Sequence, residues 1–139
     1  MPGQPGGGAV SDVEAIRALL QRYARAADDR DIPALAAVFH PDARISGARG
    51  EQSLDEWLDG MRGPRAFPVS MHLIADPLVE VDEGREAARA DTYAVVFQIA
   101  EPGSGSADLT LGIRYRDDLV RQAGGWRVLR RTATTVWMR

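Results

Sequence analysis

The first part of the chain has the hydrophobic spacing of a helix. Ser11 has the character of an N-cap, and Glu14 three residues later completes a capping-box pattern. Apolar residues then recur at intervals of three and four and form one stripe, made up of Val13, Ile16, Leu20, Tyr23 and Ala27. The pattern predicts an amphipathic helix that begins after Ser11 and ends near Asp29.

Two shorter helices are predicted downstream. Asp31 can cap the first of them, because Pro33 is tolerated in a first turn. Ser53, followed three residues later by a glutamate, repeats the capping-box pattern and predicts a helix over residues 53–61. A short strand is expected over residues 42–46, between the two helices.

Beyond residue 69 the hydrophobic period changes to the alternation that is typical of strands. Four strand-like runs follow, over residues 69–81, 86–100, 107–122 and 126–137. The segments between them are short and rich in Gly, Asp and Ser, which favours antiparallel neighbours. Helices first and strands second predict an α+β domain with helices on one side of a strongly twisted, mostly antiparallel sheet. Long strands in so small a domain must curl, and a curled sheet closed by helices leaves a pocket.

Length and composition limit the organisation of the chain. A chain of 139 residues with 45% hydrophobic and 27% charged residues is expected to form a single folded domain. Residues 1–10 are rich in Pro and Gly, so we predict a loose tail there and one domain over residues 11–139.

Composition also excludes several classes of function. A net charge of −3 without a basic block makes nucleic-acid binding unexpected. The chain has no cysteine and two histidines, which rules out thiolate chemistry and a three-His metal site, and we expect no metal. It also lacks a phosphate loop and a dinucleotide fingerprint, so we expect no cofactor. No apolar run approaches the roughly 20 residues of a membrane span, and the start does not resemble a signal peptide, so a cytoplasmic location is the expectation.

Two residues are candidates for acid–base chemistry. Asp28 falls at the border of the apolar helix stripe, so its carboxylate is either turned toward the interior or solvated at the helix end. His72 lies among apolar residues of the first strand-like run, and an imidazole is the natural general base near neutral pH. The alternative is a structural histidine, since alternation does not tell which strand face looks inward.

Two arginines interrupt apolar strand sequence. Arg114 and Arg131 either project into the pocket, where they would clamp an anion or oxyanion, or belong to a solvated strand face.

The chain from about Ser11 onward resembles the SnoaL-like branch of the nuclear-transport-factor-2-like superfamily. The resemblance rests on AIRALLQRY at 15–23 leading to Asp28, DIPALAAVFHPDA at 31–43, SMHL at 70–73 and GWRV at 125–128. It implies a cone-shaped α+β barrel in which three helices close a highly curved sheet over a deep pocket. It also implies homodimers formed through the sheet.

Within the superfamily the pattern is closest to scytalone dehydratases and hexachlorocyclohexane dehydrochlorinases, lyases that need no cofactor. By this resemblance, Asp28 supports His72 as the catalytic pair, and Arg131, five residues past a Trp, matches an arginine of the dehydrochlorinases. Tyr23 stands where the dehydrochlorinases have a lysine. The second pocket histidine of scytalone dehydratases has no counterpart. Polyketide cyclases and ketosteroid isomerases share the pocket with other distributions of acids and bases.

Two hypotheses follow for the function. The first is a cofactor-independent lyase or isomerase acting on a hydrophobic small molecule, with His72 and Asp28 catalytic and Tyr23, Arg131 and Arg114 binding the substrate. The second is a non-catalytic binding or assembly module of the same fold. Contact between Asp28 and His72 would favour the first, whereas a pocket filled by Met71, Phe97 and Trp137 would favour the second. In either case we expect a homodimer, because three helices leave one sheet face uncovered.

Overall fold

The helices lie where capping and hydrophobic spacing predict them. The computed structural model describes residues 11–139, so the predicted tail at residues 1–10 lies outside the described residues. The helices are α1 (Asp12–Asp29), α2 (Ile32–Val38) and α3 (Leu54–Arg62). The side chains of Ser11 and Asp31 each accept a hydrogen bond from a first-turn amide of α1 and α2 at 3.1 Å. None of these helices, nor any other in residues 11–139, is long and apolar enough to cross a membrane.

A curved sheet makes up the rest of the domain. Its strands are β1 (Phe39–Gly47), β2 (Gly50–Ser53), β3 (Val69–Ile74), β4 (Leu78–Val81), β5 (Ala87–Ile99), β6 (Leu109–Gln122) and β7 (Gly125–Met138). The spatial order is β2-β1-β7-β6-β5-β3, with β4 also paired to β5. All pairs are antiparallel except β1 with β7, which run parallel. The fold is therefore α+β with a mixed, mostly antiparallel sheet, as predicted.

The strands differ from the prediction in three places. The run at 69–81 is divided into β3 and β4 by residues 75–77, where Pro77 offers no backbone N–H to the sheet. The first strand begins at Phe39, directly after α2, and is therefore longer than the expected 42–46. β2 was not predicted, because a four-residue strand that pairs through a tight turn leaves little periodic signal.

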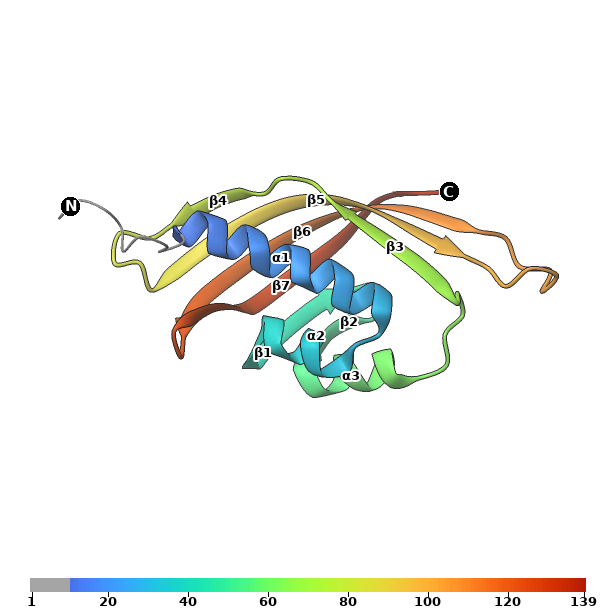
Figure 1. The fold of residues 1–139 in the computed structure, drawn as a ribbon, viewed down its shortest axis with the longest axis horizontal. Coiled ribbons are helices and arrows are strands. Elements are labelled where there is room, and N and C mark those ends of the chain that lie inside the picture. Colours follow the sequence, from blue (N-terminus) through green and yellow to red (C-terminus); the bar gives the residue numbers. More distant parts are fainter. Residues whose placement is uncertain (1–10) are drawn as a thin grey trace.

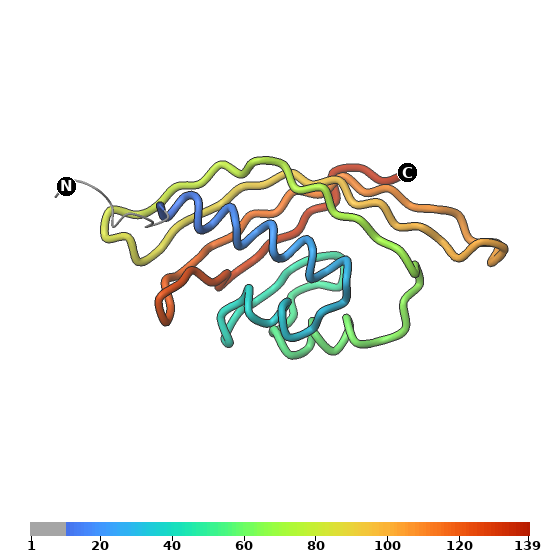
Figure 2. Tube along the Cα trace, viewed as in Figure 1, coloured from blue at the N-terminus to red at the C-terminus, as the bar shows by residue number. Residues whose placement is uncertain are grey.

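The helices cover one face of the sheet. Figure 1 shows α1 lying across the inner face of the long strands, with α2 and α3 beside the short strands β1 and β2. The core lies between these layers and includes Ile16 and Leu20 of α1, Leu35 of α2, Leu119 of β6 and Val128 of β7. Residues 63–68 carry the chain from α3 to the sheet edge where β3 pairs with β5 (Figure 2). This path brings β3 against the end of α1, where the candidate site lies.

Candidate active site

Asp28 lies in the last turn of α1, and its carboxylate meets His72 in β3. Oδ1 of Asp28 lies 2.6 Å from Nδ1 of the imidazole, and Oδ2 accepts a hydrogen bond from the His72 backbone N–H at 2.9 Å. The Ser70 hydroxyl donates to Oδ1 at 3.1 Å. The side chains of His72 and Asp28 are 12% and 19% exposed. The two candidates therefore touch, as expected, in a setting where a carboxylate needs hydrogen-bond partners.

The carboxylate determines how the imidazole can act. With Nδ1–H donating to Asp28, Nε2 of His72 is the nitrogen that can accept a proton. Among residues 11–139, the ring has one hydrogen-bond partner, Asp28. The ring lines the cavity described below and packs edge-on against Tyr23, with the centroids 6.0 Å apart. The pair can therefore take up a proton from the cavity while the carboxylate stabilises the resulting imidazolium.

Arg131 of β7 lies at the base of the cavity. Its side chain is 2% exposed, and Nε and Nη2 donate to the two carboxylate oxygens of Asp117 at 2.7 and 2.9 Å. The guanidinium lies between two aromatic rings, 4.2 Å from the centroid of Tyr23 and 4.1 Å from that of Tyr115. Burial opposes its charge, but Asp117 and the two tyrosines outweigh burial and raise the pKa of Arg131.

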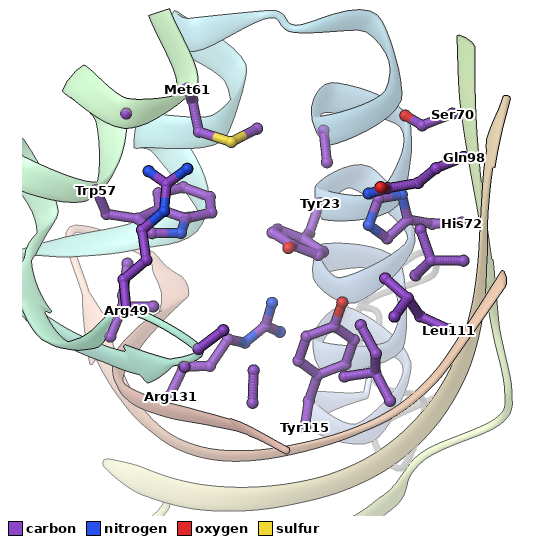
Figure 3. A pocket seen from close by; sticks show the side chains of 18 of the residues that line it. Tyr23, Arg49, Trp57, Met61, Ser70, His72, Gln98, Leu111, Tyr115 and Arg131 are labelled. Carbon is purple, nitrogen blue, oxygen red and sulfur yellow. The ribbon is translucent and has the colours of Figure 1, made fainter. Parts of the chain in front are cut away.

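Arg131 also offers an unused donor. The remaining guanidinium nitrogen, Nη1, is buried and has no hydrogen-bond partner within residues 11–139. Figure 3 shows the guanidinium pointing into the cavity between Tyr23 and Tyr115. A buried, unpaired charged donor is costly, so a ligand oxygen is its natural partner.

Tyr115 of β6 supplies a second polar group beside Arg131. Burial raises the pKa of Tyr115 well above its ordinary value, and the neighbouring Tyr23 acts in the same direction. The Tyr115 phenol therefore stays protonated at neutral pH and remains a donor.

These groups surround a cavity of about 490 Å³. Figure 3 shows Arg49, Trp57 and Met61 on one side and Ser70, His72 and Gln98 on the other, with Tyr23, Tyr115 and Arg131 between them. Further lining comes from apolar side chains, including Phe67, Val96, Leu111 and Ile113. A mostly apolar cavity of this size with a few convergent polar groups is typical of small-molecule sites.

Comparison with known families agrees with this geometry. Residues 8–132 match the family model described as the SnoaL-like domain. The chain belongs to the SnoaL-like domain family. Uncharacterized proteins of Mycobacterium tuberculosis and Mycobacterium bovis are 34% identical to it over 132 residues, which covers 90% of this chain and 86% of theirs.

Solved structures similar to this SnoaL-like domain include named enzymes. A candidate scytalone dehydratase from Novosphingobium aromaticivorans superposes with a TM-score of 0.80 at 20% identity, covering 90% of this chain and 84% of the other. A hexachlorocyclohexane dehydrochlorinase of type 2 superposes with a TM-score of 0.79 at 15% identity, covering 90% of this chain and 85% of the other. An NTF2-like protein with a cystatin-like fold, also from N. aromaticivorans, superposes with a TM-score of 0.77 at 25% identity, covering 90% of this chain and 82% of the other. These likenesses establish an NTF2-like fold for the SnoaL-like domain.

Arg114 does not line the cavity of the SnoaL-like domain. Its neighbours Ile113 and Tyr115 line it, so alternation along β6 places Arg114 on the outer face. There its guanidinium donates to both carboxylate oxygens of Asp91, at 2.8 and 2.6 Å, and lies 5.3 Å from the ring centroid of Tyr93. The expectation that Arg114 projects into the pocket is therefore wrong. Strand alternation assigns residues to two faces but does not tell which face is covered by helices.

Several lining residues of the SnoaL-like domain escaped the sequence reasoning. Trp57 and Met61 follow Leu54 at intervals of three and four, a helical spacing that indicates an inward face of α3. Arg49 lies in the turn between β1 and β2, where the sequence carries no periodic signal. Asp117, the partner of Arg131, is placed opposite it by the register of β6 and β7. No group of three or more potential metal ligands comes together within residues 11–139.

Proposed function

We propose that this SnoaL-like domain is a cofactor-independent lyase or isomerase of the dehydratase or cyclase type. It would remove a proton from carbon in a hydrophobic small molecule such as a polyketide, terpenoid or steroid. The observation that carries the proposal is the hydrogen-bonded Asp28–His72 pair, whose imidazole lines a mostly apolar cavity of about 490 Å³.

The geometry supports a specific division of roles. Nε2 of His72 accepts the proton from carbon, and Asp28 orients the ring and offsets the charge of the imidazolium. The electron pair left on carbon moves toward a neighbouring carbonyl or expels a leaving group. Arg131 Nη1 or the Tyr23 hydroxyl stabilises the oxygen on which negative charge develops. Loss of water, migration of a double bond and closure of a ring by an enolate are all accessible by this route.

A non-catalytic binding or assembly module is the second candidate, and the observations favour it less. The cavity is open, and Met71 and Trp137 are 48% and 44% exposed, so they do not fill it. Phe97 pairs with Met71 across β3 and β5 on the same outer face. The structural neighbours named as a dehydrochlorinase and a candidate dehydratase also speak for elimination chemistry on this fold.

The test is solvent-derived deuterium exchange. Bicyclic ketones such as 1-tetralone are incubated with the protein in heavy water, and loss of the signal of the protons next to the carbonyl is followed by NMR. We expect wild type to accelerate exchange in ketones that bind the cavity, and His72→Ala to lose this acceleration while still binding them. Exchange that survives in His72→Ala, or bound ketones that never exchange, would overturn the proposal.

A further inference from the structure

We propose that the ligand of this cavity is an anion, an apolar ring-bearing carboxylate whose acid group lies against Arg30 and Arg49. The inference rests on the site described above and narrows its substrate class. It concerns a second polar subsite, separate from the dyad and from Arg131.

The charges that line the cavity are all of one sign. Arg30, Arg49 and Arg131 line it together with His72, and no aspartate or glutamate is among the lining residues that the structure describes. This one-sidedness occurs in a chain whose acids outnumber its basic residues, with a net charge of −3. A cleft lined by one sign of charge with low-dielectric walls attracts ligands of the opposite sign.

The protein neutralises one of these arginines and not the other two. Arg131 is paired with Asp117, whereas Arg30 and Arg49 have no carboxylate partner within residues 11–139. Arg30 donates to the backbone oxygen of Met61 at 2.8 Å. The guanidinium of Arg65, which also has no carboxylate partner within residues 11–139, lies close by, and burial together with this like charge lowers the pKa of Arg30. An anion placed here would favour the charged form of Arg30 and so oppose both effects.

Arg30 and Arg49 reach the same end of the cavity. Arg30 contacts Met61, and Nη1 of Arg49 lies against Gly60, the preceding residue of α3. A Cβ on Gly60 would come within 2.9 Å of that nitrogen. Gly60 thus leaves room for the tip of the Arg49 side chain at this end of the cavity.

The positions of Arg49 and His72 on opposite walls of the cavity orient the ligand. Arg49 is solvent-exposed, which places it at the opening, and Figure 3 shows it on the wall opposite His72. Trp57 and Met61 lie on the same wall as Arg49, Tyr23 lies between that wall and His72, and all three offer apolar surface. A flat hydrophobic body with its carboxylate at the Arg30 and Arg49 end therefore presents its far carbon atoms to the imidazole. A guanidinium suits a carboxylate better than other cations because two parallel N–H groups meet its two oxygens.

The test compares two probes of nearly equal shape, 2-naphthoate and methyl 2-naphthoate, by isothermal titration calorimetry. We expect wild type to bind the carboxylate about tenfold tighter than the ester, the difference that one charge-assisted contact provides. Arg49→Gln should remove most of this preference without weakening the ester.

Arg22→Gln is the matched control, because Arg22 is an exposed arginine of α1 that does not line the cavity. It should leave both affinities unchanged. Equal affinity for the two probes, binding of neither, or a preference that Arg22→Gln removes as well as Arg49→Gln would overturn the proposal. This readout needs no turnover. A carboxylate preference without deuterium exchange would leave the anion site standing and remove the proposed chemistry, and the reverse result would remove the anion site alone.

Discussion

The Asp28 carboxylate holds His72 at two points, the ring and the backbone. One oxygen lies 2.6 Å from Nδ1 and the other accepts the backbone N–H at 2.9 Å, so a single side chain both orients the imidazole and fastens β3 to the end of α1. The two residues are therefore not equivalent. His72 can be truncated without disturbing the backbone contact, whereas any loss of the Asp28 carboxylate alters the contact between helix and strand.

Substitution of the two residues should accordingly separate activity from stability. His72→Ala should reduce catalysed exchange by a factor of about 10²–10⁴ and change the free energy of unfolding little, since the backbone N–H and Ser70 still bind Asp28. Asp28→Ala should reduce exchange similarly and also lower the free energy of unfolding by about 1–3 kcal/mol, because the buried donors lose their acceptor. Urea denaturation read alongside the exchange assay measures both, and equal destabilisation by the two variants would contradict the structure.

The buried pair of Arg131 and Asp117 makes a second prediction. Arg131→Met leaves the Asp117 carboxylate buried without its cation, which should cost about 3–5 kcal/mol of unfolding free energy. Adding Asp117→Leu should recover most of that loss while leaving exchange impaired, because the Nη1 donor is still absent. Urea denaturation of the single and double variants tests this, and a double variant no more stable than the single one would refute it.

Acid should weaken the attachment of α1 to the sheet. Asp12 accepts hydrogen bonds from Arg85, Arg121 and Trp126 at 2.7, 2.6 and 3.2 Å, and these donors hold the pKa of its carboxyl well below the usual range. Because the folded-state pKa is depressed, this stabilisation is complete above the unfolded value of about 3.9 and is lost as the pH falls through the folded value.

The corresponding variant is Asp12→Asn. At pH 7 it should lower the free energy of unfolding by about 1–3 kcal/mol, and the gap from wild type should narrow below about pH 4. Melting temperatures of the variant and of wild type, recorded from pH 7 to pH 2, measure this difference in stability. Glu14→Gln, which changes an exposed acid of the same helical turn, is the control and should leave the curve nearly unchanged. A stability difference between variant and wild type that stays constant from pH 7 to pH 2 would show that the Asp12 charge does not cause it.

We predict a homodimer formed through the outer face of the sheet. That face carries an exposed apolar patch, made up of Val69, Met71, Leu73, Tyr93, Val136 and Trp137. The Trp137 indole lies directly over Gly112, where the Cβ of any other residue would clash with the ring, so glycine leaves the space that the indole occupies. Contiguous apolar surface of this kind on a folded domain marks an interaction site.

Light scattering at micromolar concentration should give twice the 15.1 kDa mass of the chain. Leu73→Glu should shift the protein to the monomer at little cost to the fold, since Leu73 is 54% exposed. Ala37→Glu, an exposed change on α2, should remain dimeric. A wild-type monomer would exclude this interface.

Local signals predicted the helices well because their information lies within a few residues. Ser11, Asp31 and Ser53 each cap a helix within the turn that follows, and all three helices begin where these residues place them. Helix periodicity put the Asp28 carboxylate at the edge of the buried stripe and left its direction open, and the family resemblance supplied its contact with His72.

The positions of Arg114 and Arg131 could not be predicted from local sequence patterns. Arg114 and Arg131 both interrupt apolar strands, yet one is paired on the outer face and the other is buried beneath the cavity. The difference depends on strand register and on which face the helices cover, and both are properties of residues distant in sequence. Arg49 lies in the turn between β1 and β2, and its guanidinium lies against Gly60 of α3. Hydrophobic periodicity carries no signal for either position.

The parallel pairing of β1 with β7 bears on the order in which the domain can assemble. β1 is made soon after α2, but Ser46 finds its partner Thr132 in the strand furthest along the sequence. β1 and β2 cannot be joined to the rest of the sheet before that strand exists, and Arg131 at the base of the cavity lies in the same strand. Pairing between segments so far apart in sequence is slow to form, so β1 and β2 have no place in the sheet until synthesis has passed β7. During that interval the unpaired edge of β1 is exposed to pairing with other chains.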